Sequence, residues 1–229
     1  MMSDFISTGA VDHVPAPAAL LDRFQTRAAI VKYTKNQSVL TAGDVDADLY
    51  WIQQGRVQFS LMSAQGKEVI LRDMAAGDIF GESAALTRTP RSVSATALSD
   101  CVIARLSGNE FLQLVRESPD TGLWLADILA RRVADLTATV FEMATLPVAG
   151  RVQLALLKLI APSSEKGDQR LIRDMPTHLE LASKVGTHRE AVTRELNLLK
   201  KEGIIRKKGK DLEVLSVSKL RASYNRFTR

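Results

Sequence analysis

The sequence predicts an α+β fold in three consecutive parts: an antiparallel β domain, one long helix, and a compact helical domain that ends the chain. Two observations predict it. Residues 29–106 form short runs rich in β-branched and aromatic residues, and turns recur among them every 11 or 12 residues, at Gly43, Gly55, Gly66 and Gly77. This spacing is typical of an antiparallel sandwich or barrel. From residue 107 onward the apolar residues recur with helical spacing instead.

The β domain is expected to occupy residues 1–120, with an N-terminal segment and a short helix around Ala18–Arg27 before the first strand. After the last strand, the stretch SGNEFLQLVRES starts a helix, because Ser107 is followed three residues later by Glu110. This spacing matches a capping box, in which each side chain satisfies an amide at the helix start.

One long helix is predicted over residues 121–146. Its apolar positions are spaced by three and four residues, and they are Leu125, Leu129, Val133, Leu136, Val140 and Met143. A narrow apolar stripe over six or seven turns favours a coiled coil between two copies of the chain, with burial against the β domain as the alternative. Pro147 and Gly150 are expected to end this helix and to mark a domain boundary.

The last part, residues 147–229, is strongly basic. It contains 18 Lys and Arg residues and 9 Asp and Glu residues, a net charge of +9. Residues 1–146 contain 13 basic and 17 acidic residues, a net charge of −4, so the overall charge of +5 combines an acidic part and a basic part. Such asymmetry indicates a polyanionic partner for the basic part, either nucleic acid or a membrane surface. The alternative is a solvated basic face without a partner.

Residues 177–201 match a helix-turn-helix. Thr177 can cap a first helix, Val185-Gly186 closes it, and a second helix begins near Thr187. The segment 204–215 then resembles a two-stranded wing with a basic turn. The side chains expected to project from the second helix are Thr187, His188, Arg189, Glu190, Thr193 and Arg194.

These side chains suit double-stranded DNA. Arginine can donate two hydrogen bonds to a guanine edge, and glutamate can accept one from cytosine. Lysines of the wing, Lys208 in particular, suit phosphates, which add affinity but no sequence information. A helical hairpin that is purely structural would not require basic residues on both the second helix and the wing.

The stretch FGESAALTRTPRSVSATA, residues 80–97, places Glu82 after a glycine and Arg91 before Ser92. The simplest interpretation is a surface turn with a Glu–Arg ion pair, which contributes less than about 1 kcal/mol.

Three segments together give a sharper interpretation. They are GRVQFSLMSAQGKEVILRDMAAGDIFGE, LARRVADLTATVFEMATLPVAGRVQLALL and VGTHREAVTRELNLL. With them the chain resembles the cAMP receptor protein/FNR family of bacterial transcription regulators over residues 29–215. The resemblance implies a cyclic-nucleotide-binding β-roll, a central dimerisation helix over 121–146 and a winged helix-turn-helix over 147–229. It also implies a homodimer that binds inverted-repeat half-sites in double-stranded DNA, with RNA polymerase as an expected partner.

The same resemblance assigns residues 80–97 to a phosphate-binding cassette. In it, Arg91 and Ser92 would hold a cyclic phosphate, Glu82 would accept from the ribose 2′-hydroxyl, and the backbone of Gly81, Ser83 and Ala84 would complete the site. The base would meet Leu136 and Thr137 on the long helix. The effector that the resemblance implies is cAMP. Family members that sense cAMP carry Thr-Ser at these two positions, whereas this chain carries Leu-Thr, so cGMP, another small effector or no ligand are the alternatives.

Composition excludes several other classes. A single cysteine, Cys101, excludes an internal disulfide framework and an iron–sulfur cluster ligated by cysteines of one chain, and the three histidines show no metal-binding spacing. No run approaches the roughly 20 apolar residues of a membrane helix, and no signal peptide pattern opens the chain. A cytoplasmic, metal-free protein is therefore expected. No catalytic constellation supports the remaining alternatives, an enzyme linked to cyclic nucleotides or a purely sensory module.

Overall fold

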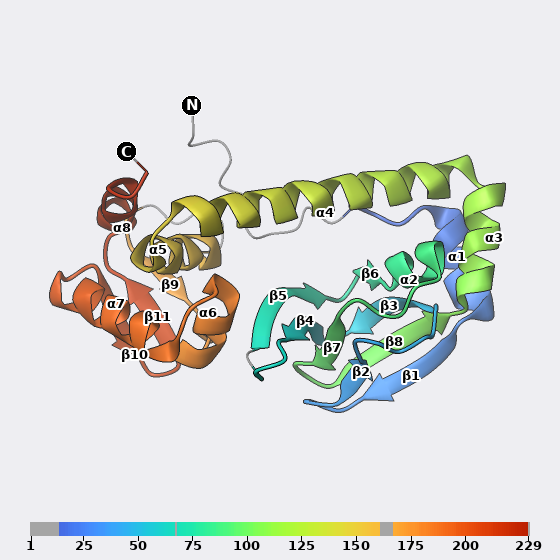
Figure 1. The fold of residues 1–229 in the computed structure, drawn as a ribbon, viewed down its shortest axis with the longest axis horizontal. Coiled ribbons are helices and arrows are strands. Elements are labelled where there is room, and N and C mark those ends of the chain that lie inside the picture. Colours follow the sequence, from blue (N-terminus) through green and yellow to red (C-terminus); the bar gives the residue numbers. More distant parts are fainter. Residues whose placement is uncertain (1–13, 67, 161–166, 229) are drawn as a thin grey trace. The chain divides into compact units, whose positions relative to one another are not determined.

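The computed structural model describes residues 14–66, 68–160 and 167–228 (Figure 1). The chain folds as two compact units, one formed by residues 12–133 and the other containing residues 134–229. The first unit holds two antiparallel sheets and the second holds helices with a small sheet, so the predicted α+β class is confirmed.

The first unit is a β-roll of two four-stranded sheets. The strand orders are β1-β8-β3-β6 and β2-β7-β4-β5, and every pair is antiparallel. Side chains from both sheets, among them Ile52, Val57 and Ile103, are fully buried between them. The strands are β1 (Ala29–Tyr33), β2 (Ser38–Leu40), β3 (Leu49–Gln54), β4 (Arg56–Met62), β5 (Glu68–Ala75), β6 (Ile79–Phe80), β7 (Ser94–Ala97) and β8 (Cys101–Leu106).

The turn between β3 and β4 shows why glycine recurs in this part of the sequence. Gly55 has a φ of +95°, in the region that side chains disfavour. A Cβ atom there would lie 2.4 Å from the carbonyl oxygen of Asp100. Only glycine therefore lets this turn pack against the neighbouring loop.

Four helices belong wholly or partly to the β-roll: α1 (Ala18–Arg27), α2 (Glu82–Thr87), α3 (Gly108–Glu117) and the start of α4 (Pro119–Thr145). The predicted cap of α3 is confirmed, because the Ser107 hydroxyl accepts from the Glu110 amide at 3.3 Å. The Glu110 carboxylate instead pairs with Arg23 of α1 at 2.7 Å. The reciprocal half of the expected capping box is thus replaced by an ion pair between helices.

The apolar stripe of α4 divides into two parts. Leu125 is buried and Leu129 is partly buried, and both pack in the β-roll core with α1 and α3. Farther along, Val133, Leu136 and Val140 are 63%, 58% and 66% exposed. Burial against the β domain is therefore correct for the first part of the stripe, and only the second part is open to a partner.

The second unit contains α5 (Val148–Leu159), α6 (His178–Val185), α7 (Arg189–Lys201), α8 (Val217–Asn225) and a three-stranded sheet in the order β10-β11-β9. Its strands are β9 (Arg170–Ile172), β10 (Ile205–Lys208) and β11 (Asp211–Val214). The long helix α4 ends at Thr145, before Pro147, but the expectation that Gly150 helps to end it was wrong. Pro147 is the N-cap of α5, and Gly150 lies inside that helix, where a Cβ atom would come within 3.3 Å of the Phe227 ring.

Helices α6 and α7 form the predicted helix-turn-helix. Thr177 and Glu180 make a complete capping box at the start of α6, and Gly186 ends the helix in the left-handed conformation. Val192, Leu196 and Leu199 of α7 face a core shared with α5, α6 and the sheet. This anchoring leaves the opposite face of α7 outward. Within the described residues, no helix is both long and apolar enough to cross a membrane.

Candidate functional site

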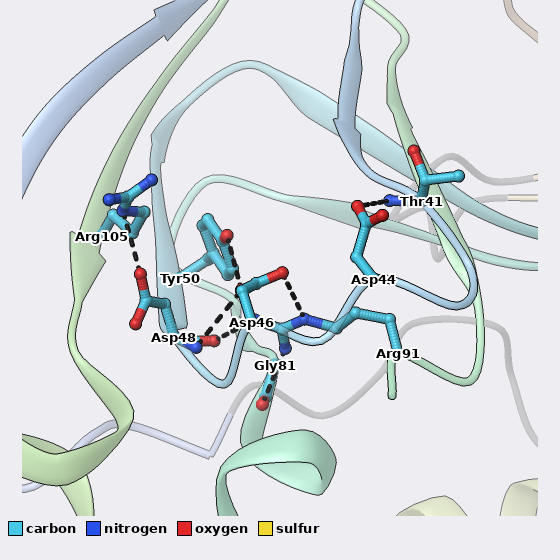
Figure 2. A network of polar contacts seen from close by, with 8 residues as sticks. All are labelled: Thr41, Asp44, Asp46, Asp48, Tyr50, Gly81, Arg91 and Arg105. Carbon is cyan, nitrogen blue, oxygen red and sulfur yellow. Dashed lines mark hydrogen bonds and ion pairs between the residues drawn. The ribbon is translucent and has the colours of Figure 1, made fainter. Parts of the chain in front are cut away.

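Arg91 lies in the β-roll with its side chain 3% exposed, beside Asp46, Asp48, Tyr50 and Gly81 (Figure 2). Two hydrogen bonds hold the Arg91 backbone: its amide donates to the Asp44 carbonyl at 2.7 Å, and its carbonyl accepts from the Gly43 amide at 2.8 Å. The side chain then reaches the Tyr50 ring, with the guanidinium carbon 5.4 Å from the ring centroid. Arg91 is thus a held cation, not a mobile surface group.

Four hydrogen bonds hold the Arg91 guanidinium. Asp46 accepts two of them, from Nη2 and from Nε at 3.2 Å, while the Asp48 carbonyl accepts from Nη2 at 2.7 Å and the Gly81 carbonyl accepts from Nη1 at 3.1 Å (Figure 2). A guanidinium carries five N–H groups. One Nη1 N–H therefore has no acceptor among the described residues.

Asp46 offsets much of the Arg91 charge. Burial opposes its ionisation, yet the hydrogen bonds and the charge of Arg91 hold the pKa of Asp46 below its usual range. The Asp46 side chain is 39% exposed, so water reaches it while the Arg91 side chain stays covered. This two-point contact fixes the plane of the guanidinium.

Glu82 is the first residue of α2 and is buried. Its carboxylate accepts from Arg132 of α4 and from the Ser83 hydroxyl at 3.0 Å. Burial would raise the pKa of Glu82, but the Arg132 charge outweighs it and holds the pKa below the usual value. Glu82 therefore stays an ionised acceptor at neutral pH.

The simple Glu82–Arg91 ion pair does not form, and neither residue is at the surface. Glu82 pairs with Arg132 and Arg91 pairs with Asp46. The segment between them begins as helix α2 and not as a loop. Gly81, the N-cap of α2, has a φ of +97°, and a Cβ atom there would lie 2.5 Å from Asp48 O and 3.0 Å from Arg91 Nη1.

The other predicted cassette residues are close in the chain but differ in exposure. Ser83 and Ser92 are exposed and Ala84 is buried. Ser83, Ala84 and Glu82 form the first turn of α2, where amides lack helical acceptors. Leu136 and Thr137 are exposed on α4 and belong to the second unit, whereas the cassette residues belong to the first.

The outward face of α7 gathers most of the predicted DNA-binding residues. A shallow hollow on it is lined by Arg189, Glu190, Thr193, Arg194, Asn197, Leu198 and Lys201. Arg189 and Arg194 are exposed, and neither has an acidic partner among the described residues. These two arginines are therefore free to meet an external anion or base edge.

The remaining predicted residues flank this face. His188 is the exposed N-cap of α7, Thr187 is partly buried in the turn, and Lys208 is exposed at the end of β10. In the wing, Arg206 pairs with Glu213 at 2.7 Å, so its charge is already partnered.

Comparison with known proteins agrees with both halves of the chain. Residues 30–118 match the family model of the cyclic nucleotide-binding domain, and residues 150–223 match that of the Crp-like helix-turn-helix domain. The chain is 33% identical over 186 residues to the cyclic AMP receptor protein of Thermus thermophilus, covering 81% of this chain and 82% of that protein. This chain belongs to the Crp/Fnr family of transcription regulators.

A second relative agrees with the family assignment, and a solved structure agrees with the fold. The cAMP-activated global transcriptional regulator CRP of Pasteurella multocida is 31% identical over 201 residues, which is 87% of this chain and 96% of that protein. The solved c-di-GMP responsive global regulator CLP of Xanthomonas campestris has a TM-score of 0.75 at 24% identity, over 86% of this chain and 99% of that one. This Crp/Fnr protein is thus a DNA-binding regulator with a cyclic nucleotide-binding domain.

Sequence reasoning missed Asp46 and Arg132, which hold Arg91 and Glu82. The side chains that it expected to project from the second helix also did not include Asn197, Leu198 and Lys201 in the hollow on α7. Asn197 follows Arg189, Thr193 and Arg194 at helical spacing, so extending the outward face by one turn would have found it. Asp46 and Arg132 carry no comparable signal, because their partners lie 45 and 50 residues away in the chain.

Proposed function

We propose that this protein is a homodimeric regulator that binds inverted half-sites in double-stranded DNA, and that its DNA affinity depends on cAMP bound in the β-roll. One observation carries the effector proposal: Arg91 Nη1 donates to the carbonyl of Gly81 at 3.1 Å. This hydrogen bond joins Arg91, a buried cation, to the residue that precedes Glu82. Glu82 is an ionised hydrogen-bond acceptor. A ribose 3′,5′-phosphate requires this combination.

The cassette offers separate contacts for the phosphate and the ribose of the nucleotide. The phosphodiester carries one negative charge, and the remaining Nη1 N–H of Arg91 and the Ser92 hydroxyl are its proposed donors. The ribose 2′-hydroxyl donates to Glu82, which Arg132 keeps ionised. Asp46 sets the orientation of Arg91, so the guanidinium does not have to be ordered when the ligand arrives.

The identity of the base rests on the relatives and on α4. Two relatives are described as cAMP-activated or as a cyclic AMP receptor, which supports cAMP. The second candidate is a different effector, such as cGMP or a cyclic dinucleotide. It is supported by Leu136, where the family's cAMP sensors carry a hydroxyl, and by a structural relative described as responsive to c-di-GMP.

The test is calorimetric titration of the purified protein with cAMP, cGMP and c-di-GMP, followed by DNA binding with and without each ligand. We expect cAMP to bind with about one molecule per chain and to raise DNA affinity by about 5- to 150-fold, the usual range of allosteric coupling. Binding of only another nucleotide would select the second candidate. Equal DNA affinity with and without all three would reject effector control by these nucleotides.

We expect Leu136→Thr to strengthen the cAMP response, because it adds a hydroxyl at the position where the family's cAMP sensors meet adenine. Thr137→Ala should keep most of the nucleotide affinity but weaken the gain in DNA affinity, since the base contact on α4 couples the two units. The measurement is the ratio of DNA affinities with and without cAMP for each variant. A ratio that neither substitution changes would place the base elsewhere.

DNA reading is assigned to Arg189, Glu190 and Arg194, with Thr187, His188 and Thr193 beside them. We expect Arg189→Ala to cost about 1–3 kcal/mol and to relax preference at one G·C pair of a TGTGA-like half-site. Lys208→Ala should weaken binding to all duplexes alike and reduce the salt dependence, because its partner is a phosphate. Fluorescence anisotropy with a duplex carrying two inverted TGTGA half-sites, and with a scrambled duplex, separates the two effects. An unchanged ratio of specific to scrambled affinity in Arg189→Ala would refute the assigned docking.

The broader proposals follow from the same arrangement. Residues 1–120 form the sensory part, 121–146 the dimerisation helix and 147–229 the DNA-binding part. RNA polymerase is the proposed further partner, and the cytoplasm is the proposed location. Catalysis is not part of the proposal, since the relative that matches 87% of the chain is a transcription regulator.

A further inference from the structure

We propose that His178 contacts a DNA phosphate through its Nε2 atom only when the imidazole is protonated, so that DNA binding takes up a proton and strengthens as the pH falls. The inference rests on the proposed DNA-binding role of α7. It adds a regulatory contact from α6 that the recognition residues do not supply.

The hydrogen bonds around His178 fix its tautomer. The Thr193 hydroxyl donates its single proton to the carbonyl of Arg189 at 2.9 Å. The same hydroxyl oxygen lies 2.7 Å from His178 Nδ1, so it must accept there and Nδ1 must carry a proton. In the neutral ring Nε2 is therefore the unprotonated nitrogen, and it has no hydrogen-bond partner among the described residues. Any further proton binds at Nε2.

The charges that face His178 are positive on both neighbouring elements. Arg189 and Lys200 come from α7, and Lys207 comes from β10. On its own helix, the Glu180 carboxylate is engaged by the Thr177 amide at 2.7 Å in the capping box. Partial burial and these three cations lower the pKa of His178, so the free protein holds the ring neutral at pH 7.

A DNA phosphate near His178 favours the protonated imidazole. Arg189 belongs to the proposed DNA-binding surface, Lys200 lies on the same helix and Lys207 lies in the wing. A phosphate bound at this surface offsets their charge. It also offers an acceptor to Nε2–H, and a hydrogen bond between two charged groups is stronger than a neutral one. The pKa of His178 is therefore higher in the complex than in the free protein.

The sign of the effect follows from proton linkage. When binding raises the pKa of a group, protonation of that group strengthens binding. The full gain in affinity is present at a pH below the pKa of the free protein, and it is lost as the pH rises through the pKa of the complex. Because burial and the neighbouring cations hold the free pKa below the ordinary value of about 6.5, affinity should rise as the pH falls from above the bound pKa to below 6.5. A purely structural His178–Thr193 bond uses Nδ1–H, which both ring forms carry, and predicts no such dependence.

The experiment measures DNA affinity by anisotropy at pH 5.5, 6.5, 7.5 and 8 and constant ionic strength, with cAMP saturating. Two duplexes are used, the inverted TGTGA duplex and its scrambled version, because a phosphate contact acts on both alike. The variants are wild type, His178→Gln and His178→Arg. Gln cannot be charged, while Arg is charged at every pH.

We expect wild type to bind both duplexes about tenfold more tightly at pH 5.5 than at pH 8, beyond any change shared by the variants. His178→Gln should stay near the weaker limit, and His178→Arg near the tighter limit, at all four pH values. Equal pH dependence in all three proteins would overturn the inference while leaving the proposed function intact. If wild type bound neither duplex at any pH, the proposed function itself would fail.

Discussion

Removing the Arg91 side chain is expected to abolish nucleotide binding at ordinary concentrations. Arg91→Ala deletes the buried cation and leaves a phosphate without its countercharge, and losing one partner of a buried charged contact typically costs about 2–5 kcal/mol. We therefore expect cAMP affinity to fall on the order of 100-fold or more, measured by calorimetric titration. The cAMP-dependent gain in DNA affinity should disappear with it.

Arg105→Ala is the matched control for this experiment. Arg105 lies in the same network and pairs with Asp48 at 3.1 Å, but its side chain is 50% exposed (Figure 2). Losing an exposed ion pair changes stability by less than about 1 kcal/mol, so nucleotide affinity should stay near that of wild type. Thermal unfolding of both variants shows whether the β-roll is intact. Wild-type cAMP affinity in a folded Arg91→Ala protein would rule out the cassette as the phosphate site.

Charged residues in the exposed part of the α4 stripe are expected to separate the dimer. Leu136 and Val140 are more than half exposed, and covering such side chains in a coiled coil stabilises by about 1.5–3 kcal/mol each. The double variant Leu136→Glu/Val140→Glu removes this gain and places like charges opposite each other across a twofold axis. Analytical ultracentrifugation should then show the monomer mass of 25.1 kDa and not twice that value.

DNA binding should weaken in the same variant. A twofold dimer covers two half-sites about 34 Å apart, whereas a monomer covers only one. Leu123→Glu is the control, since Leu123 is 70% exposed on α4 but lies off the stripe. Leu129 is unsuitable, because its side chain packs in the β-roll core and a charge there would unfold that unit. If the double variant sediments as wild type does, the exposed stripe is not the dimer contact.

Much of this molecule follows from local patterns in the sequence. The order of strands and helices, the caps at Ser107 and Thr177 and the turn at Gly186 depend on residues a few positions apart. The outward arginines of α7 follow in the same way, because helical spacing decides which side chains share a face. For these features, neighbouring residues contain nearly all the information.

Other features of the site required the tertiary structure. The sequence identified Arg91 and Glu82 but not Asp46 and Arg132, which hold them from 45 and 50 residues away. It placed six apolar residues in one stripe of α4 but not the point near Val133 where the stripe leaves the β-roll core. These ion pairs depend on how sheets and helices pack, because a charged side chain can pair with any opposite charge that the packing brings close. The sequence alone therefore identified the groups that we propose to bind a nucleotide and DNA, and the tertiary structure decided which neighbours hold those groups in place.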